Sequence, residues 1–118
     1  MMEMIQTFMT KVKERDHLRS LLNNADSLMV RFICGQQNID IFLKNGECML
    51  LYNPSGNVKQ CEIYGDIETI KQLLTGEGKL RSLMKNGRLQ VMASFRTLLL
   101  LEALFYLSKI ETKSYQII

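Results

Sequence analysis

The spacing of apolar residues divides the first half of the chain into one helix and three strands. Residues 5–22 carry apolar side chains at helical spacing, which predicts an amphipathic helix that ends at the polar stretch 23–26. Three alternating runs follow, at 27–35, 38–46 and 47–53, and the breaks between them have the length of hairpin turns. We therefore expect these three strands to form an antiparallel meander.

The second half of the chain alternates between strands and helices. A turn at 53–57 contains the only proline, and the alternating run 58–65 after it predicts a fourth strand. Asp66 is expected to cap a helix that ends at the glycine-containing stretch 75–78. Three further elements complete the series: a short helix at 79–87, a fifth strand at 88–94 and a last helix at 95–109. No internal repeat is present.

The faces of the first three strands that point away from the predicted core are unusually apolar. The charged residues Arg31, Asp40 and Lys44 on these faces are accompanied by five large apolar ones: Met29, Ile33, Phe42, Met49 and Leu51. An antiparallel sheet with one face in water usually shows a cleaner alternation of polar and apolar positions. We therefore expect part of this second face to be covered, by a helix or by something else.

The last predicted helix is apolar around most of its circumference. Its most apolar segment, residues 97–107, is flanked by Arg96 and Lys109. This segment is shorter than the roughly 20 apolar residues that a membrane-spanning helix needs. At 100° per residue its leucines spread widely, while Glu102 and Tyr106 fall in one narrow stripe with Lys109. Such a helix has more apolar surface than one sheet contact can bury. The N-terminal helix, another subunit or an apolar ligand could supply the remaining cover.

Composition and charge narrow the class of protein. A chain of 118 residues with 47% hydrophobic and 23% charged content is typical of one folded, soluble domain, here spanning residues 1–118. The net charge of +3 is mild and no basic patch is interleaved with aromatics, so no nucleic acid partner is expected, although a weak preference for anionic surfaces stays open. The N-terminus lacks the pattern of a secretory signal, which predicts a cytoplasmic protein.

The sequence offers little catalytic chemistry. Cys34, Cys48 and Cys61 form no CxxC pair and are expected to be reduced, buried thiols in strands. The only histidine, His17, lies in a charged helical stretch, so neither a zinc site nor a cysteine–histidine pair is indicated. The stretch 75–82 lacks the first glycine and the final hydroxyl residue of a phosphate-binding loop. We therefore expect no enzyme, no metal and no cofactor.

From Cys61 to Leu107 the sequence resembles the sterol carrier protein, sterol-binding domain family. The likeness begins with a strand and a helix that starts at an aspartate and ends at two leucines followed by a glycine. A short helix ending in glycine, a strand with the pattern Lys/Arg-Leu-x-Val and an apolar last helix complete it. The positions that carry it are Asp66, Leu73, Leu74, Gly76, Leu83, Gly87, Leu89 and Val91. One departure concerns Ala93 and Ser94, which stand where that family often has a glycine followed by a polar residue.

The resemblance implies an α+β fold and a function. The fold would be a five-stranded mixed, mostly antiparallel sheet packed with helices, and an apolar tunnel between sheet and helices would bind a sterol, fatty acid or acyl chain. The residues that would line it are Leu74, Leu83, Met84, Val91, Leu100, Leu104 and Phe105. The eight methionines suit a pocket that adapts to irregular ligands, though they serve equally well as core filler.

Two functions from different classes therefore remain. The first is non-catalytic binding or carrying of an apolar lipid, which would allow a transient contact with a membrane surface. The alternative is a structural or interaction module without a usable cavity, in which the last helix forms a homodimer or partner interface. The surplus apolar surface of that helix fits both hypotheses.

Overall fold

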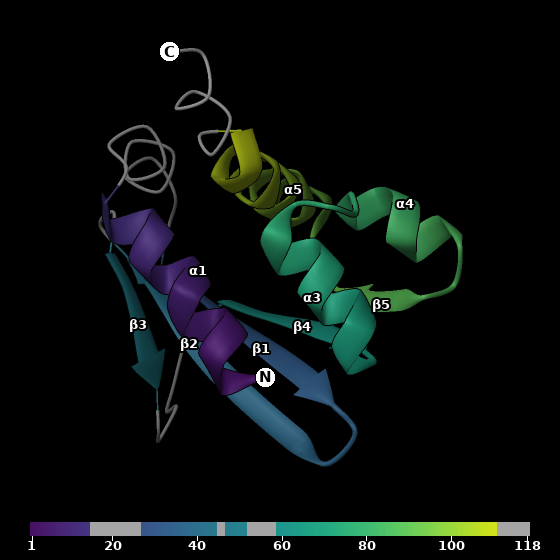
Figure 1. Cartoon of the computed structure of the whole chain (residues 1–118), viewed down its shortest axis with the longest axis horizontal. Coiled ribbons are helices and arrows are strands. Elements are labelled where there is room, and N and C mark those ends of the chain that lie inside the picture. The colour runs from purple at the N-terminus through teal and green to yellow at the C-terminus, as the bar shows by residue number, and fades with distance from the viewer. Residues whose placement is uncertain (15–26, 45–46, 52–58, 111–118) are drawn as a thin grey trace.

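A five-stranded sheet forms the base of the structure, and the helices of the described residues lie on one of its faces (Figure 1). The computed structural model describes residues 1–14, 27–44, 47–51 and 59–110. The strands are β1 (Leu28–Cys34), β2 (Gln37–Lys44), β3 (Glu47–Leu51), β4 (Lys59–Gly65) and β5 (Leu89–Met92). The helices are α1 (Met2–Glu14), α3 (Ile67–Thr75), α4 (Leu80–Lys85) and α5 (Phe95–Ile110).

The strands lie in the order β3-β2-β1-β4-β5, with β1 at the centre. The meander β1-β2-β3 is antiparallel, as the sequence predicts, whereas β4 pairs with β1 in parallel and then with β5 antiparallel. The register aligns apolar side chains across three strands, because Phe32 lies opposite both Ile39 and Ile63. The predicted mixed, mostly antiparallel α+β fold is thus confirmed.

The core lies between the sheet and the helices. Helix α1 buries Ile5, Phe8, Met9 and Val12 on one side. The ring of Phe8 packs against that of Phe105 in α5 with centroids 5.2 Å apart, so the first and last described helices meet over the sheet. Below them Phe32 is fully buried in the centre of β1.

Short polar contacts fix where the helices begin and end. The backbone N–H of Thr69 donates to Asp66 Oδ1 at 2.7 Å, which caps α3 and keeps the pKa of Asp66 below its usual value. Gly76 ends α3 with φ of +80°, a left-handed conformation that costs glycine little, and its N–H donates to the Leu73 carbonyl. Ser94 accepts from the Thr97 N–H at 3.2 Å, so the departure at this position supplies a cap for α5.

Several element boundaries differ from the sequence-based prediction by one to three residues, among them the start of the first helix and both ends of the short helix, which spans Leu80–Lys85 rather than 79–87. Helix α1 begins at Met2 rather than Ile5, and the Ile5 N–H already donates to the Met1 carbonyl. The apolar pattern misses this first turn because Met2 is exposed and adds nothing to the buried stripe. The last strand ends at Met92 rather than 94. The predicted continuation of the first helix to residue 22 lies outside the described residues.

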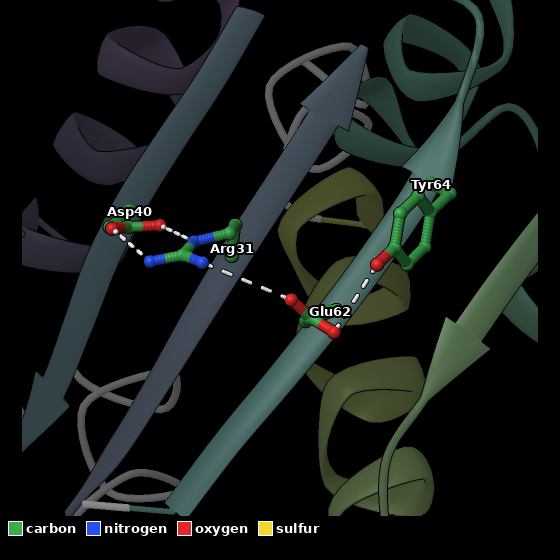
Figure 2. Close-up of polar contacts among 4 residues, drawn as sticks. All are labelled: Arg31, Asp40, Glu62 and Tyr64. Carbon is green, nitrogen blue, oxygen red and sulfur yellow. Dashed lines mark hydrogen bonds and ion pairs between the residues drawn. The ribbon is translucent and has the colours of Figure 1, made fainter. Parts of the chain in front are cut away.

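A polar network occupies the sheet face opposite the helices. Figure 2 shows Arg31 between Asp40 and Glu62, with the helices behind the strands. The Arg31 Nε and Nη2 atoms donate to the two Asp40 oxygens at 2.8 and 3.2 Å, and its Nη1 lies 3.9 Å from Glu62 Oε2. The Tyr64 hydroxyl donates to Glu62 Oε1 at 3.3 Å. These contacts satisfy charges on a face that also carries large apolar side chains.

The expectation that a helix covers part of this face is wrong for the helices of the described residues, all of which lie on the other side (Figure 1). The apolar side chains on the network's face are nevertheless unequally exposed. Met29 is only 3% exposed and Phe42 is half-buried, while Met49 is 42% exposed. Met29 near the start of β1 is therefore covered, whereas Met49 on the edge strand β3 is not.

The packing of Phe8 gives a test of the core. We expect Phe8→Ala to lower the free energy of unfolding by about 3–5 kcal/mol, because it removes a buried ring and leaves a cavity against Phe105. The matched control is Phe95→Ala at a side chain that is 66% exposed, where we expect a change within about 0.5 kcal/mol. Urea unfolding of both variants measures the difference, and equal losses would contradict this description of the core.

Candidate functional site

A cleft of about 530 Å³ lies between α4 and α5. Its α5 wall consists of Leu99, Glu102, Ala103, Phe105 and Tyr106, which follow one another at helical spacing. The α4 wall brings Leu80 and Ser82 together with three cations. The cleft is therefore apolar on the α5 side and basic on the α4 side.

A tight turn between α3 and α4 positions the basic wall of the cleft opposite α5. After Gly76, the N–H of Gly78 donates to the Gln72 carbonyl at 3.0 Å and folds the chain back over the end of α3. A Cβ at Gly78 would lie 3.0 Å from a Leu83 methyl carbon, closer than ordinary van der Waals contact, so the turn sits directly on α4. This close approach sets Lys79, the residue before α4, at the cleft.

Two polar contacts connect the walls of the cleft. Arg81 Nε donates to Glu102 Oε2 at 2.9 Å, and the Arg81 backbone N–H donates to Glu102 Oε1 at 3.3 Å. Lys79 Nζ lies 5.8 Å from the centre of the Tyr106 ring, within range of a cation–π attraction. Among the described lining residues, Lys79, Arg81 and Lys85 give three positive charges against one negative charge. The cleft consequently has a positive excess beside its apolar wall.

The residues predicted from sequence to line a pocket are mostly packed into the core. Leu74, Leu83, Leu104 and Phe105 are between 0% and 5% exposed, and the half-buried side chains of Met84, Val91 and Leu100 pack against the same hydrophobic cluster. Of the seven, Phe105 also lines the cleft. The other six pack in or against the hydrophobic core and do not line the cleft, so their contact with a ligand stays a prediction.

Sequence reasoning missed the basic side of the cleft. The last helix shows Glu102 and Tyr106 on one narrow stripe, which is the signal that could have marked its cleft-facing side. The partners of that stripe are Lys79, directly before α4, and Arg81 within α4, and the conformation of the glycine turn brings both to it. No pattern within a single element reveals such a pairing.

Metal-ligating and thiol side chains are the groups to consider for chemistry in the described residues. No cluster of three or more His, Cys, Asp or Glu side chains that could hold a metal ion occurs in the parts of the chain that the structure describes. Cys48 and Cys61 are fully buried, and burial raises the pKa of each thiol to about 12. Cys34 is half-buried, so the expectation that all three thiols are buried fails at the exposed end of β1. No helix in the described residues is both long and apolar enough to cross a membrane.

Comparison with known proteins identifies the architecture. No family model and no curated protein matches the sequence. Among solved structures, the UbiJ-SCP2 ubiquinone synthesis protein superposes with a TM-score of 0.70 at 14% identity, over 89% of this chain and 87% of that one. The palmitated SCP2L2 protein of Aedes aegypti gives a TM-score of 0.56 at 10% identity, over 87% and 91% of the two chains.

The chain has the sterol carrier protein 2 fold. The same sterol carrier fold matches part of a larger enzyme, the sec-alkylsulfatase Pisa1 from Pseudomonas sp., with a TM-score of 0.60 and 14% identity, over 73% of this chain and 14% of that chain. The fold implied by the sequence resemblance is thereby confirmed. The sterol carrier fold thus occurs both as a nearly whole chain and as a small part of a longer one.

The different burial of the thiols predicts their reactivity. In the folded protein at about pH 8, a thiol with a pKa of about 12 is ionised in roughly one molecule in 10,000, so Cys48 and Cys61 should resist alkylation. We expect iodoacetamide to label Cys34 first and to label all three residues only in urea. Peptide mass spectrometry after timed quenching measures this order. Rapid native labelling of Cys48 or Cys61 would contradict the packing of β3 or β4.

Proposed function

We propose that the chain binds a single apolar lipid without catalysis, with the cleft between α4 and α5 as its opening. The observation that carries the proposal is the cleft itself, in a chain with the sterol carrier fold. Its volume of about 530 Å³ is within the range of about 300–1,000 Å³ that is usual for small-molecule sites. The sequence-based hypothesis placed α4 and α5 among the pocket walls, and both helices line this cleft.

The structural neighbours support an apolar ligand. The Aedes aegypti neighbour is a palmitated protein, and the UbiJ neighbour is named as a ubiquinone synthesis protein. The proposal that this chain binds lipid is supported by its similarity of fold to these proteins and by the chemistry of the cleft. An alkyl chain is the ligand class that fits both.

The α5 wall offers contacts for a hydrocarbon chain. Leu99, Ala103 and Phe105 present aliphatic and aromatic surface, and each ligand methylene that leaves water contributes about 0.8 kcal/mol. Phe105 belongs to this wall, and we assign the other sequence-predicted residues behind it as the inner lining: Leu74, Leu83, Met84, Val91, Leu100 and Leu104. The half-buried thioether of Met84 can change rotamer to admit a chain more easily than a branched side chain could.

The chemistry of the described residues favours binding over catalysis. The ionisable groups of the cleft are engaged with one another, as Arg81 with Glu102, or offer only a cation, as Lys79 does. Neither arrangement supplies a nucleophile with an adjacent base. The other hypothesis, a homodimer through α5, has no support from the structural neighbours, and it becomes an outcome of the test below.

A bulky residue in the cleft tests the proposal. We expect Ala103→Trp to weaken binding of a fluorescent fatty acid at least about tenfold, because the indole would occupy the space between α4 and α5. The matched control is Ala93→Trp, at an exposed position before α5 that does not line the cleft. Fluorescence titration gives the affinities, and thermal unfolding shows whether both variants remain folded. Ala103 is a better probe than the fully buried Leu104, where a polar substitution would unfold the chain.

Two results would contradict the proposal. Equal affinities of the folded variants would show that the ligand does not enter this cleft. A wild-type chain that neither takes up the fatty acid nor carries co-purified lipid, and that elutes with the mass of a dimer, would support the interaction module instead. Size-exclusion chromatography with light scattering measures that mass.

A further inference from the structure

One side of α5 leaves large apolar side chains in water beside the cleft. Phe95 is 66% exposed, Leu99 is 41% exposed and Tyr106 is 47% exposed. Their spacing of four and seven residues places them along one side of the helix. Glu102 lies in the same row, but its carboxylate is held by Arg81. The row is therefore an exposed apolar stripe whose one negative charge is neutralised.

Cations border this stripe. Lys79 lies over the Tyr106 ring, and Lys85 lines the same cleft as Leu99 and Tyr106. No ion pair joins either lysine to another residue in the described part of the chain, so both ammonium groups are available to an anionic partner. Arg96, directly after Phe95, is also exposed. Apolar side chains and unpaired cations thus share one surface.

We propose that this surface, the α4–α5 rim formed by Lys79, Lys85, Phe95, Leu99 and Tyr106, docks on an anionic lipid bilayer. Charge complementarity selects this occupant, because lysines attract anionic headgroups while their aliphatic stems lie along the apolar boundary. Aromatic side chains such as Phe95 and Tyr106 are suited to the same boundary. Docking concerns the surface through which the chain contacts a bilayer, and it goes beyond the proposed binding of a single lipid molecule in the cleft.

Other exposed apolar residues lack this complementarity. Ile67 is 49% exposed but stands between Asp66 and Glu68. Met49 is 42% exposed but shares its strand face with Glu47, two residues away, and Met92 lies opposite Glu62 in the sheet register. Carboxylates at these places would be repelled by anionic headgroups. At the α4–α5 rim the exposed Glu77 lies two residues from Lys79, but Lys79, Lys85 and Arg96 outnumber it, so the charge beside the exposed apolar groups is positive there.

A single tryptophan tests the apolar part of the inference. The chain contains no tryptophan, so Phe95→Trp would carry one fluorophore on the rim and Met49→Trp one on the far sheet face, where the side chain is also exposed. Vesicles of phosphatidylcholine are compared with vesicles containing roughly one quarter phosphatidylglycerol. We expect the anionic vesicles to shift Phe95→Trp emission to the blue and brominated lipid to quench it, with neither effect for Met49→Trp.

A charge-matched pair of variants tests the lysines. Lys79→Gln with Lys85→Gln should weaken partitioning to the anionic vesicles by roughly 10- to 30-fold at about 50 mM salt. Lys44→Gln with Lys71→Gln removes the same charge at exposed positions away from the rim, taking the net charge from +3 to +1 in both variants, and should weaken it less than about threefold. Vesicle co-sedimentation measures both, and about 500 mM salt should abolish the difference.

Three outcomes would overturn the inference. The first is no response of Phe95→Trp to anionic vesicles, and the second is an equal loss of partitioning in the two lysine variants. The third is a blue shift that grows with protein concentration without vesicles, together with a doubled mass, which would assign the rim to a second copy of the chain. A protein that takes up the fluorescent fatty acid but ignores vesicles overturns docking and leaves the proposed function standing.

Discussion

The alignment of apolar side chains across β1 and its two neighbours is the constraint on which the rest of the structure depends. Phe32 is fully buried and lies opposite Ile39 on the antiparallel side and Ile63 on the parallel side. A shift of either neighbour by one residue would turn its apolar side chains away from the helices. The same register therefore fixes which sheet face receives α1, α3 and α5, and leaves the Arg31 network on the other face.

The position of the cleft follows from this arrangement. The centre of the sheet is occupied by a dense core, where Phe8 of α1 meets Phe105 of α5. Helix α4 lies farther out, over the short edge strand β5, and has only six residues with which to pack (Figure 1). A short helix over a sheet edge cannot fill the side of α5 that faces it, so space remains there. The Arg81–Glu102 ion pair closes that space with polar contacts where apolar packing does not reach.

The sequence predicts the elements of this fold well because each carries its own local signal. Asp66 and Gly76 mark the ends of α3, and both have the contacts expected of such caps. The place of β4 beside β1 has no comparable local signal, since an alternating strand fits either edge of a meander. The family resemblance implied a mixed sheet without a strand order, so the place of β4 beside β1 comes from the structure. The likeness itself is confirmed at the level of the fold.

The candidate site shows why local patterns are less informative about function than about fold. Helical spacing places Leu101 and Leu104 on a different side of α5 from Leu99 and Tyr106, but it does not tell which side is buried, because the helix is apolar around most of its circumference. It does not reveal that Lys79 lies above Tyr106, because that contact depends on a turn in which Gly78 sits against Leu83. The seven apolar residues that the family resemblance implied as a lining thus lie in or against the core, whereas the cations that give the cleft its character could be located only in three dimensions.

Helix α5 combines a structural and a surface role, which explains its composition. Leu101 and Leu104 are buried against the core, yet Leu99 and Tyr106 on the same helix remain exposed. A helix with only the first role would have polar residues on its outer side, because exposed apolar groups favour association. The outer side instead keeps its apolar groups and is bordered by lysines from the turn before α4 and from the end of α4. The excess apolar surface of α5 is therefore confined to the border of the cleft, where a ligand or a lipid surface would meet it, and the core accounts for the rest.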